Sequence, residues 1–446
     1  MYQQYRQDMR RRGLSRGVRM TAAAVAVVCA AAIAVVTTHQ PEAAAAPDGF
    51  YLPPEQIPVE PGTVIRTQPM SLLATLPSDQ GWPGKAEHVM YTTRLQDGSP
   101  VAVTGTYIDA AGPWLGAGPR PTVVIGPGTS GQGDRCAMSK AFSTGVTITT
   151  DPSPSFSANQ ELPSSAVWSR LGARVLVTDY VGLGTPGIHT YANRIEEAHA
   201  VLDGARAANN LAGTGPDTPL VFWGYSQGGG AVAAAAEMAP DYAPELNLKG
   251  TWAGGPVADL AAILERIDGA LIGGAIGFAI NGLLARYPDL SKAVDRVMSQ
   301  SGRDTLVALG DACIGDIIAR YPFLKTTSLT HDGQPLGAHL QAIPEAAPAL
   351  ADLRVGTLTP ASPVLITSGR HDDTVPYDQA RQLADDWCAK GATVEFRTNE
   401  LPPLLPGTTI PNHFGPEIID GFGPDNAITY LLDRLAGKPD SGCTVD

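Results

Sequence analysis

The sequence predicts an α/β fold in which helices cover a mostly parallel central sheet. Two observations support this prediction. Short apolar, β-branched runs that end in glycine or a polar loop recur at residues 121–126, 173–180, 220–223, 248–255, 363–369 and 392–397. Segments with helical composition lie between or after them, at residues 196–209, 231–238, 377–389 and 424–435. This alternation is typical of parallel sheets, because parallel strands need long crossover connections.

The chain before this alternation has a different character. Residues 89–94 and 101–108 are strand-like and flank a turn at residues 96–99, which predicts a β-hairpin. Residues 47–85 are rich in proline and have no sustained period, so we expect an extended arm that lies over the domain.

Residues 220–238 contain the most informative pattern. An apolar, strand-like run leads into Gly224-Tyr225-Ser226-Gln227-Gly228, and an alanine-rich helical run follows. A Gly-x-Ser-x-Gly motif between a strand and a helix is typical of a nucleophile elbow, a sharp turn that exposes the serine hydroxyl above the sheet. We therefore predict Ser226 as a nucleophile and the backbone amide of Gln227 as an oxyanion donor.

Two alternatives to the elbow deserve comparison. A five-residue pattern with two glycines also arises by chance. A phosphate-binding loop is the alternative interpretation of glycines between a strand and a helix. This stretch lacks both the Gly-x-Gly-x-x-Gly spacing and the Gly-Lys-Ser/Thr signature of such loops.

A serine hydroxyl becomes a good nucleophile when a histidine, oriented by a carboxylate, takes its proton. In α/β-hydrolases the chain order is serine, acid, histidine. Asp372 lies in the loop after the strand-like run 363–369, and His413 is the only histidine that follows it. The sequence therefore predicts Asp372 and His413 as the acid and base, within an α/β-hydrolase fold.

Other side chains compete for these roles. Asp373 is the nearest rival to Asp372, and a surface or packing role is the alternative for His413. His371 is expected to border the acid. His331 and His339 precede the acid in the chain, so we expect solvated or packing residues there.

A second oxyanion donor is expected in the loop after the run 122–125. Four glycines in residues 126–133 leave backbone amides accessible there, and Thr129 and Ser130 are the candidate donors. An ordinary turn-rich loop is the alternative interpretation.

Composition and the N-terminus indicate an exported globular protein. The 446 residues are 43% hydrophobic and 17% charged. Six arginines precede an apolar run at residues 21–36 and small residues at 43–46, which predicts a secretory signal peptide over residues 1–46. A twin-arginine signal and an uncleaved membrane anchor are the alternatives. Without residues 1–46 the formal charge falls from −13 to about −17, which argues against nucleic acid or anionic membranes as electrostatic partners.

Four cysteines remain beyond the export segment. In an exported protein they predict two disulfides, for which three pairings exist. We favour Cys136 with Cys313 and Cys388 with Cys443, because the second bond would pin the C-terminal tail to the helix that carries Trp387. The sequence has no Cys-x-x-Cys or His-Glu-x-x-His pattern, so no metal site is expected.

These features predict an organisation in which residues 47–256 and 348–446 form the hydrolase core and residues 257–347 a helical cap. Residues 269–285, within the cap, are apolar and carry no charge. We interpret the cap as a lid over Ser226 with an apolar wall for an acyl chain. A buried core helix and a transmembrane span are the alternatives for residues 269–285.

Several of these motifs together resemble the secretory lipase family, the lipase-A-like α/β-hydrolases of fungi and actinobacteria. The resemblance rests on Pro127-Gly128-Thr129, residues 179–187, the Ser226 elbow, and residues 372–376 followed by His413. It implies carboxylic ester hydrolysis, the triad Ser226, Asp372 and His413, and a disulfide like that between Cys136 and Cys313. Members also transfer acyl groups to other acceptors. Some have an aspartate near the position of Ser130, and this departure leaves the second donor open.

The sequence therefore predicts a secreted or envelope-associated serine ester hydrolase, a lipase or esterase that works through an acyl-enzyme and without a cofactor. An acyltransferase, a peptidase, a non-catalytic lipid carrier and a cell-surface structural protein are the alternatives. We expect a lipid or small-molecule ester as substrate, a monomer, transient contact with a lipid interface, and no nucleic-acid partner.

Overall fold

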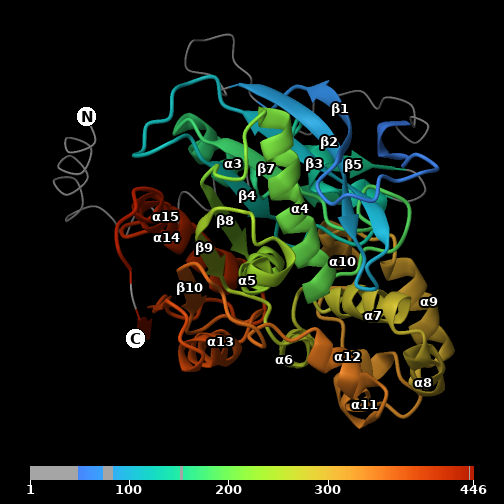
Figure 1. The fold of residues 1–446 in the computed structure, drawn as a ribbon. Helices are drawn as coiled ribbons and strands as arrows, with labels where there is room; N and C mark the ends of the chain where they lie inside the picture. Colours follow the sequence, from blue (N-terminus) through green and yellow to red (C-terminus); the bar gives the residue numbers. More distant parts are fainter. Residues whose placement is uncertain (1–48, 74–83, 151–153, 441, 446) are drawn as a thin grey trace. The chain divides into compact units, whose positions relative to one another are not determined.

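The computed structural model describes residues 49–73, 84–150, 154–440 and 442–445. The predicted export segment, residues 1–46, lies outside them. The described chain forms a large sheet in the order β1-β2-β3-β7-β4-β8-β9-β10-β11-β12 (Figure 1). Its strands are β1 (Val64–Met70), β2 (Lys85–Arg94), β3 (Pro100–Asp109), β4 (Thr122–Gly126), β7 (Arg174–Thr178), β8 (Leu220–Tyr225), β9 (Leu248–Gly254), β10 (Val364–Gly369), β11 (Val394–Asn399) and β12 (Cys443–Val445).

The sheet changes character at β7. Strands β1, β2, β3 and β7 pair antiparallel, and β2 and β3 form the predicted hairpin. From β7 through β4 and β8 to β12 all pairs are parallel. The mostly parallel sheet of an α/β-hydrolase is therefore confirmed, and the carboxyl ends of its parallel strands lie at a common edge.

Helices cover both faces of the parallel half. The crossover helices α4 (Arg194–Ala212), α5 (Gln227–Tyr242) and α13 (Tyr377–Ala389) pack against strand residues such as Val124 and Phe222. On the other face, α3 (Leu162–Arg170) and α15 (Ala427–Leu435) pack against Val123 and Val221, whose side chains point the opposite way along the same strands.

A group of helices lies between β9 and β10 and appears together in the lower right of Figure 1. Its members are α6 (Leu260–Ile267), α7 (Ala275–Arg286), α8 (Asp289–Val297), α9 (Gln300–Leu309), α10 (Ile314–Arg320), α11 (Leu336–Ala342) and α12 (Ala346–Asp352). They share an apolar cluster that also includes Tyr191. Within the described residues, no helix has the length and hydropathy needed to cross a bilayer.

Some elements differ from the sequence predictions. The expected extended arm contains the strand β1, which its pattern did not reveal because β1 is an edge strand with a partly exposed face and Pro69 near its end. The last predicted helix begins at Ala427 rather than residue 424, and α14 (Gly415–Phe422) precedes it. A separate two-stranded sheet, β5 (Val146–Thr149) with β6 (Ser155–Ala158), was also not predicted.

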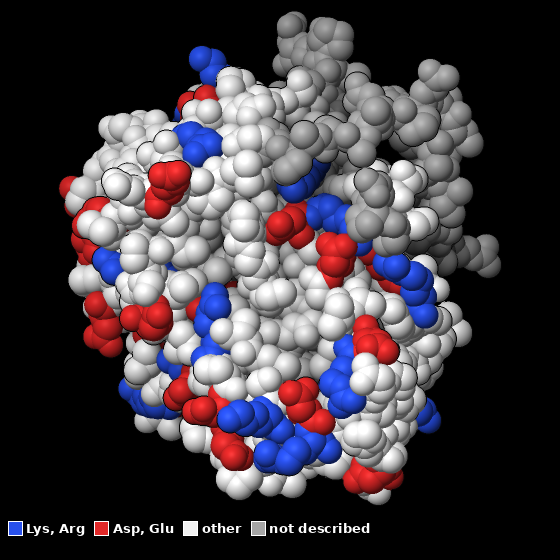
Figure 2. Space-filling view, turned by 90° about the vertical axis from the view of Figure 1, so that its right-hand side faces the viewer, with Lys and Arg blue, Asp and Glu red and all other residues white. Residues whose placement is uncertain are grey.

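Two disulfides link distant segments, and they are the pairs favoured from the sequence. Cys136 bonds Cys313, and Cys388 at the end of α13 bonds Cys443 in β12. On the face shown in Figure 2, acidic and basic side chains are interspersed around an uncharged central area. That face therefore offers no continuous basic surface for a nucleic-acid backbone.

Candidate active site

Ser226 lies at the sharp turn between β8 and α5. Its φ of 60° and ψ of −121° are unusual for a residue with a side chain, and such strain is found mainly at functional positions. Glycines make the turn sterically feasible. A Cβ at Gly224 would lie 2.2 Å from the carbonyl oxygen of Gly228, and one at Gly228 would lie 1.9 Å from that of Gly126. The motif thus has the elbow geometry predicted from its sequence.

The acid and base candidates are in direct contact. His413 Nδ1 donates to Asp372 Oδ2 across 2.7 Å, and both side chains are almost fully buried. Asp372 Oδ1 accepts from the backbone amides of Thr374 and Val375, at 2.8 and 2.9 Å. These bonds hold the carboxylate at the end of β10 and fix the imidazole tautomer, so that Nε2 carries the lone pair.

The imidazole of His413 lies beside the elbow. Ser226 N donates to Gly254 O at 2.9 Å, and a Cβ built on the next residue, Gly255, would lie 3.6 Å from His413 Cε1. Ser226 and His413 therefore flank the same short backbone segment at the end of β9. Among the described residues His413 Nε2 is buried without a hydrogen-bond partner, so the Ser226 hydroxyl is not bonded to it in this structure. Such bonds are often long in unliganded enzymes.

His413 itself is fixed by its backbone and by a neighbouring ring. It lies in a single π-helical turn, Ile410–Phe414, directly before α14. The hydroxyl of Tyr225, the residue before the candidate nucleophile, donates to His413 O at 2.7 Å, and the two rings lie 5.0 Å apart. One residue of the elbow strand thus positions the histidine.

The competing residues have other contacts. Asp373 Oδ2 accepts from Gly407 N, Thr409 N and Asn412 Nδ2, so Asp373 organises the loop before His413 rather than the imidazole. His339 bonds Asp332 within the helical group between β9 and β10. His371 is exposed beside Asp372.

The candidate oxyanion loop follows β4. Gly128 N donates to the buried carboxyl group of Glu161, and Gln132 N donates to Ala312 O. Burial raises the pKa of Glu161 to about 7. Thr129 and Ser130 lie between these two anchored positions. The hydroxyl of Thr129 bonds the Tyr191 hydroxyl at 2.9 Å, so its side chain is held as well. The amide of Gln227, in the first turn of α5, has no partner within its helix.

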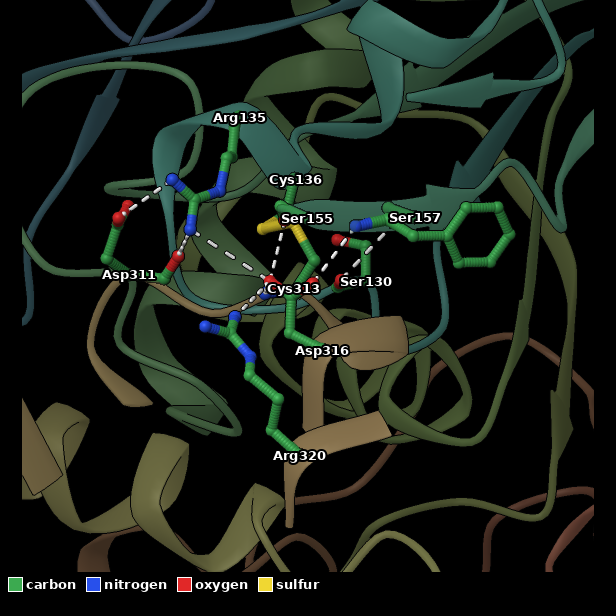
Figure 3. Close-up of a disulfide and its surroundings, with 10 residues drawn as sticks. Ser130, Arg135, Cys136, Ser155, Ser157, Asp311, Cys313, Asp316 and Arg320 are labelled. Carbon is green, nitrogen blue, oxygen red and sulfur yellow. Dashed lines mark hydrogen bonds and ion pairs between the residues drawn. A yellow bond between two sulfur atoms is a disulfide. The ribbon is translucent and has the colours of Figure 1, made fainter. Parts of the chain in front are cut away.

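The Cys136–Cys313 disulfide attaches this loop to the helical group (Figure 3). Beside the disulfide, Ser130 O accepts from Ile314 N at 2.8 Å. Gly131 of the loop and Cys313 of the helical group therefore form an isolated antiparallel β-bridge. Figure 3 also shows Asp316 bonded to Ser155 and close to Arg135 and Arg320. The loop is thus braced from the side of the helical group.

Two residues near Gln227 were missed by the sequence analysis. The side chain of Gln227 donates to Glu197 Oε1 at 2.7 Å and lies 3.0 Å from His189 Nε2. The sequence contained one signal for Glu197: two consecutive glutamates, Glu196 and Glu197, begin an otherwise alanine-rich helix. A carboxylate on a buried helix face needs a hydrogen-bond partner, which would have indicated a polar contact there.

Strained serine, oriented imidazole and nearby backbone donors form an arrangement suited to acyl transfer. Among the described residues, no cluster of three or more His, Cys, Asp or Glu side chains is arranged to hold a metal ion. A surface hollow of about 400 Å³ between α6 and α11, lined by residues such as Leu264 and Ala338, contains none of the candidate residues.

The fold and this arrangement define the class: the protein is an α/β-hydrolase. A model of the secretory lipase family matches residues 162–442, and the chain belongs to that family. A secreted triacylglycerol lipase of Malassezia restricta is 28% identical over 398 residues, 88% of this chain and 80% of the relative. A probable inactive lipase of Mycobacterium tuberculosis is 29% identical over 421 residues, 88% of this chain and 82% of the relative.

Solved structures share the fold. The closed state of Candida antarctica lipase A superposes with a TM-score of 0.73 at 23% identity, over 89% of this chain and 87% of that one. A single-site mutant of the rice cell wall degrading esterase LipA from Xanthomonas oryzae gives a TM-score of 0.67 at 19% identity, over 84% of this chain and 100% of that one. Family membership supports a hydrolase of the lipase or esterase type, and the secreted relatives and the two disulfides support secretion.

Proposed function

We propose that this protein is a secreted serine carboxylic-ester hydrolase that acts on acylglycerols or other acyl esters. Ser226 attacks the ester carbonyl, and His413 Nε2 takes the hydroxyl proton and returns it to the leaving alcohol. Asp372 keeps the imidazole in the required tautomer. A water then attacks the acyl-enzyme, with His413 again as base, and releases the carboxylic acid and Ser226.

One observation carries this proposal. His413 donates to the buried Asp372 from Nδ1 and presents an unpaired, buried Nε2 beside the elbow that holds Ser226 in a strained conformation. A packing histidine would instead have both ring nitrogens satisfied or exposed to water. The mechanism requires the Ser226 hydroxyl to reach His413 Nε2, and a serine hydroxyl can adopt several staggered rotamers.

The neighbouring helices and the relatives support the proposed substrate class. We propose that residues 257–347, which include α6 to α11 and the start of α12, form a cap over Ser226. The apolar residues of α7, most of them buried, would line the acyl side of the site. The secreted triacylglycerol lipases among the relatives are consistent with a lipid ester as substrate.

The test combines labelling with turnover. We expect a fluorophosphonate probe to label Ser226 and p-nitrophenyl esters to be hydrolysed at a rate that varies with acyl chain length. Labelling of another residue, or no labelling of the folded protein, would remove the proposal. Products formed in the presence of an added alcohol or an amide substrate separate hydrolysis from acyl transfer and from peptidase activity.

A non-catalytic lipid carrier is the second candidate. This alternative is supported by the relative from Mycobacterium tuberculosis, which is named a probable inactive lipase. A carrier would retain a fatty-acid ester without cleaving it and would bind it equally well after Ser226→Ala.

A further inference from the structure

The proposed triad leaves one prominent part of the structure without a role. Residues 180–191 follow β7 and contain most of the run 179–187 on which the family resemblance rests. Their start is fixed by the buried Asp179, which accepts from Thr104 Oγ1 and from both the amide and the hydroxyl of Ser139. Tyr180 has a φ of 67°, so this segment, like the elbow, holds a side-chain residue in the left-handed region.

This segment reaches the candidate oxyanion loop at three points. The Tyr180 hydroxyl donates to Pro127 O at 3.0 Å, and the Tyr191 hydroxyl bonds Thr129 Oγ1 at 2.9 Å. Gln132 Nε2 donates to His189 O at 2.9 Å. Both ends of the segment and its interior therefore hold the loop that carries the second candidate donor.

The same segment also reaches the first candidate donor. His189 Nδ1 donates to Val181 O at 2.9 Å, because a carbonyl can only accept, and this leaves His189 Nε2 as an acceptor. Burial lowers the pKa of His189 to about 4, so the ring is neutral at pH 7. Gln227 Nε2 therefore donates one proton to His189 Nε2 and the other to Glu197 Oε1.

Glu197 completes this arrangement. Its Oε1 accepts from Ala192 N at 2.9 Å as well as from Gln227, so it connects the end of the segment to the first residue of α5. Gln227 is almost fully buried, and its side-chain amide has two acceptors in fixed directions. A glutamine held in this way cannot turn without breaking a buried hydrogen bond, which is costly.

We propose that residues 180–191 are the frame that sets the oxyanion hole, with His189 and Glu197 as positioning residues for the backbone amide of Gln227. The frame fixes the distance between that amide and the loop of Thr129 and Ser130, where the tetrahedral oxyanion would be bound. The inference rests on the proposed serine-hydrolase function. It adds a specific role for side chains that do not touch the substrate.

The test compares two histidines with closely similar surroundings. His189 stacks on Tyr180 and bonds a backbone carbonyl through Nδ1, and His199 stacks on Tyr242 and bonds Arg94 O in the same way. Both are buried, but His199 has no bond to Gln227. His189→Phe should lower kcat about tenfold to a hundredfold with KM within about threefold, because small displacements of catalytic groups have effects of this size. His199→Phe should lower Tm and leave kcat unchanged.

Glu197 supplies a conservative rescue. Glu197→Leu should lower kcat like His189→Phe, whereas Glu197→Gln keeps an oxygen acceptor for Gln227 and Ala192 and should restore most of kcat. The affinity of an alkyl boronic acid, whose adduct with Ser226 mimics the tetrahedral intermediate, should fall by the same factor as kcat. Gln227→Met keeps a similar side-chain volume and removes the amide that donates to both His189 and Glu197. It replaces His189→Phe in the test if that variant does not fold.

An active parent whose kcat and boronate affinity stay within about twofold in these variants would overturn the inference and leave the proposed function intact. A loss that appears only in KM would also overturn it. An inactive parent that is not labelled at Ser226 would instead contradict the proposed function.

Discussion

The two halves of the candidate site are built in different ways. The acid–base half consists of two side chains, Asp372 and His413, joined by a single hydrogen bond and held by their own loops and by Tyr225 of the elbow strand. The oxyanion half is held by a buried network from the loop after β4, residues 180–191, α4 and the helical group that includes Cys313. Proton transfer needs a few groups in contact, whereas stabilising a charge needs several backbone donors fixed at once. Substitutions in the two halves therefore separate proton transfer from charge stabilisation.

The largest effect is expected at the nucleophile. Ser226→Ala should lower kcat about a millionfold, because Asp372 and His413 then have no hydroxyl to activate and no acyl-enzyme forms. His413→Ala should have an effect of similar size. Initial rates on a p-nitrophenyl ester measure both, with circular dichroism to show that the variants fold. Residual activity within a hundredfold of the parent would mean that another residue is the nucleophile.

A smaller loss is expected at the acid. Asp372→Asn should lower kcat about ten-thousandfold, because an amide that donates to Nδ1 forces the imidazole into the wrong tautomer. Asp373→Asn is the matched control, since one amide oxygen can still accept from the donors at Gly407, Thr409 and Asn412. It should stay within about tenfold of the parent. Equal losses at the two positions would show that Asp372 is not the specific partner of His413.

The disulfides test whether bracing from the helical group matters for the oxyanion half. They close loops of 177 and 55 residues, so each should contribute about 4 to 5 kcal/mol to the free energy of unfolding. Removing Cys136 and Cys313 by serine substitution should in addition lower kcat by about tenfold, because Ser130 and Gln132 are anchored beside that bond. Removing Cys388 and Cys443 should leave kcat unchanged. Denaturant titration and kinetics at 20 °C separate the two effects, and a matching loss of kcat in both pairs would contradict the bracing role.

The smallest effect concerns stability and pH. Burial raises the pKa of Glu197 from 4.5 to about 8. The folded state therefore binds an extra proton between these values, and its stability falls as pH rises through this range. The slope from this group alone is about 1.4 kcal/mol per pH unit. Glu197→Gln should make the unfolding free energy less dependent on pH between 5 and 8, as measured by denaturant titration. An unchanged slope would show that Glu197 is not protonated in the folded protein.

The sequence was informative about the acid–base half for a physical reason. Chain order and the positions of strand ends restrict the acid and base to a few residues, so Ser226, Asp372 and His413 were named without coordinates. The central parallel strands were equally visible, because both of their faces are buried and most of their residues are apolar. The edge strands β1 and β12 each pair with one neighbouring strand, and their residues are partly exposed. They therefore lack the continuous apolar run that marks the central strands.

The oxyanion half was much less visible. Gln227 was predicted as a donor from the helix N-terminus, and Thr129 and Ser130 from the glycines around them. His189 and Glu197 look like ordinary residues of a loop and a helix, and only the folded chain brings both within reach of the Gln227 side chain. Cooperative networks of this kind depend on contacts between segments far apart in the sequence, which local patterns do not record.

The most direct test is a crystal structure of the protein after reaction with an alkyl fluorophosphonate. We expect a covalent bond from phosphorus to Ser226 Oγ, with His413 Nε2 within hydrogen-bond distance of that oxygen. We also expect a phosphoryl oxygen about 3 Å from the amide of Gln227 and from an amide of the loop at Thr129 and Ser130. An adduct on another residue, or a phosphoryl oxygen directed away from the Gln227 amide with His413 remote from Ser226, would contradict the proposed mechanism.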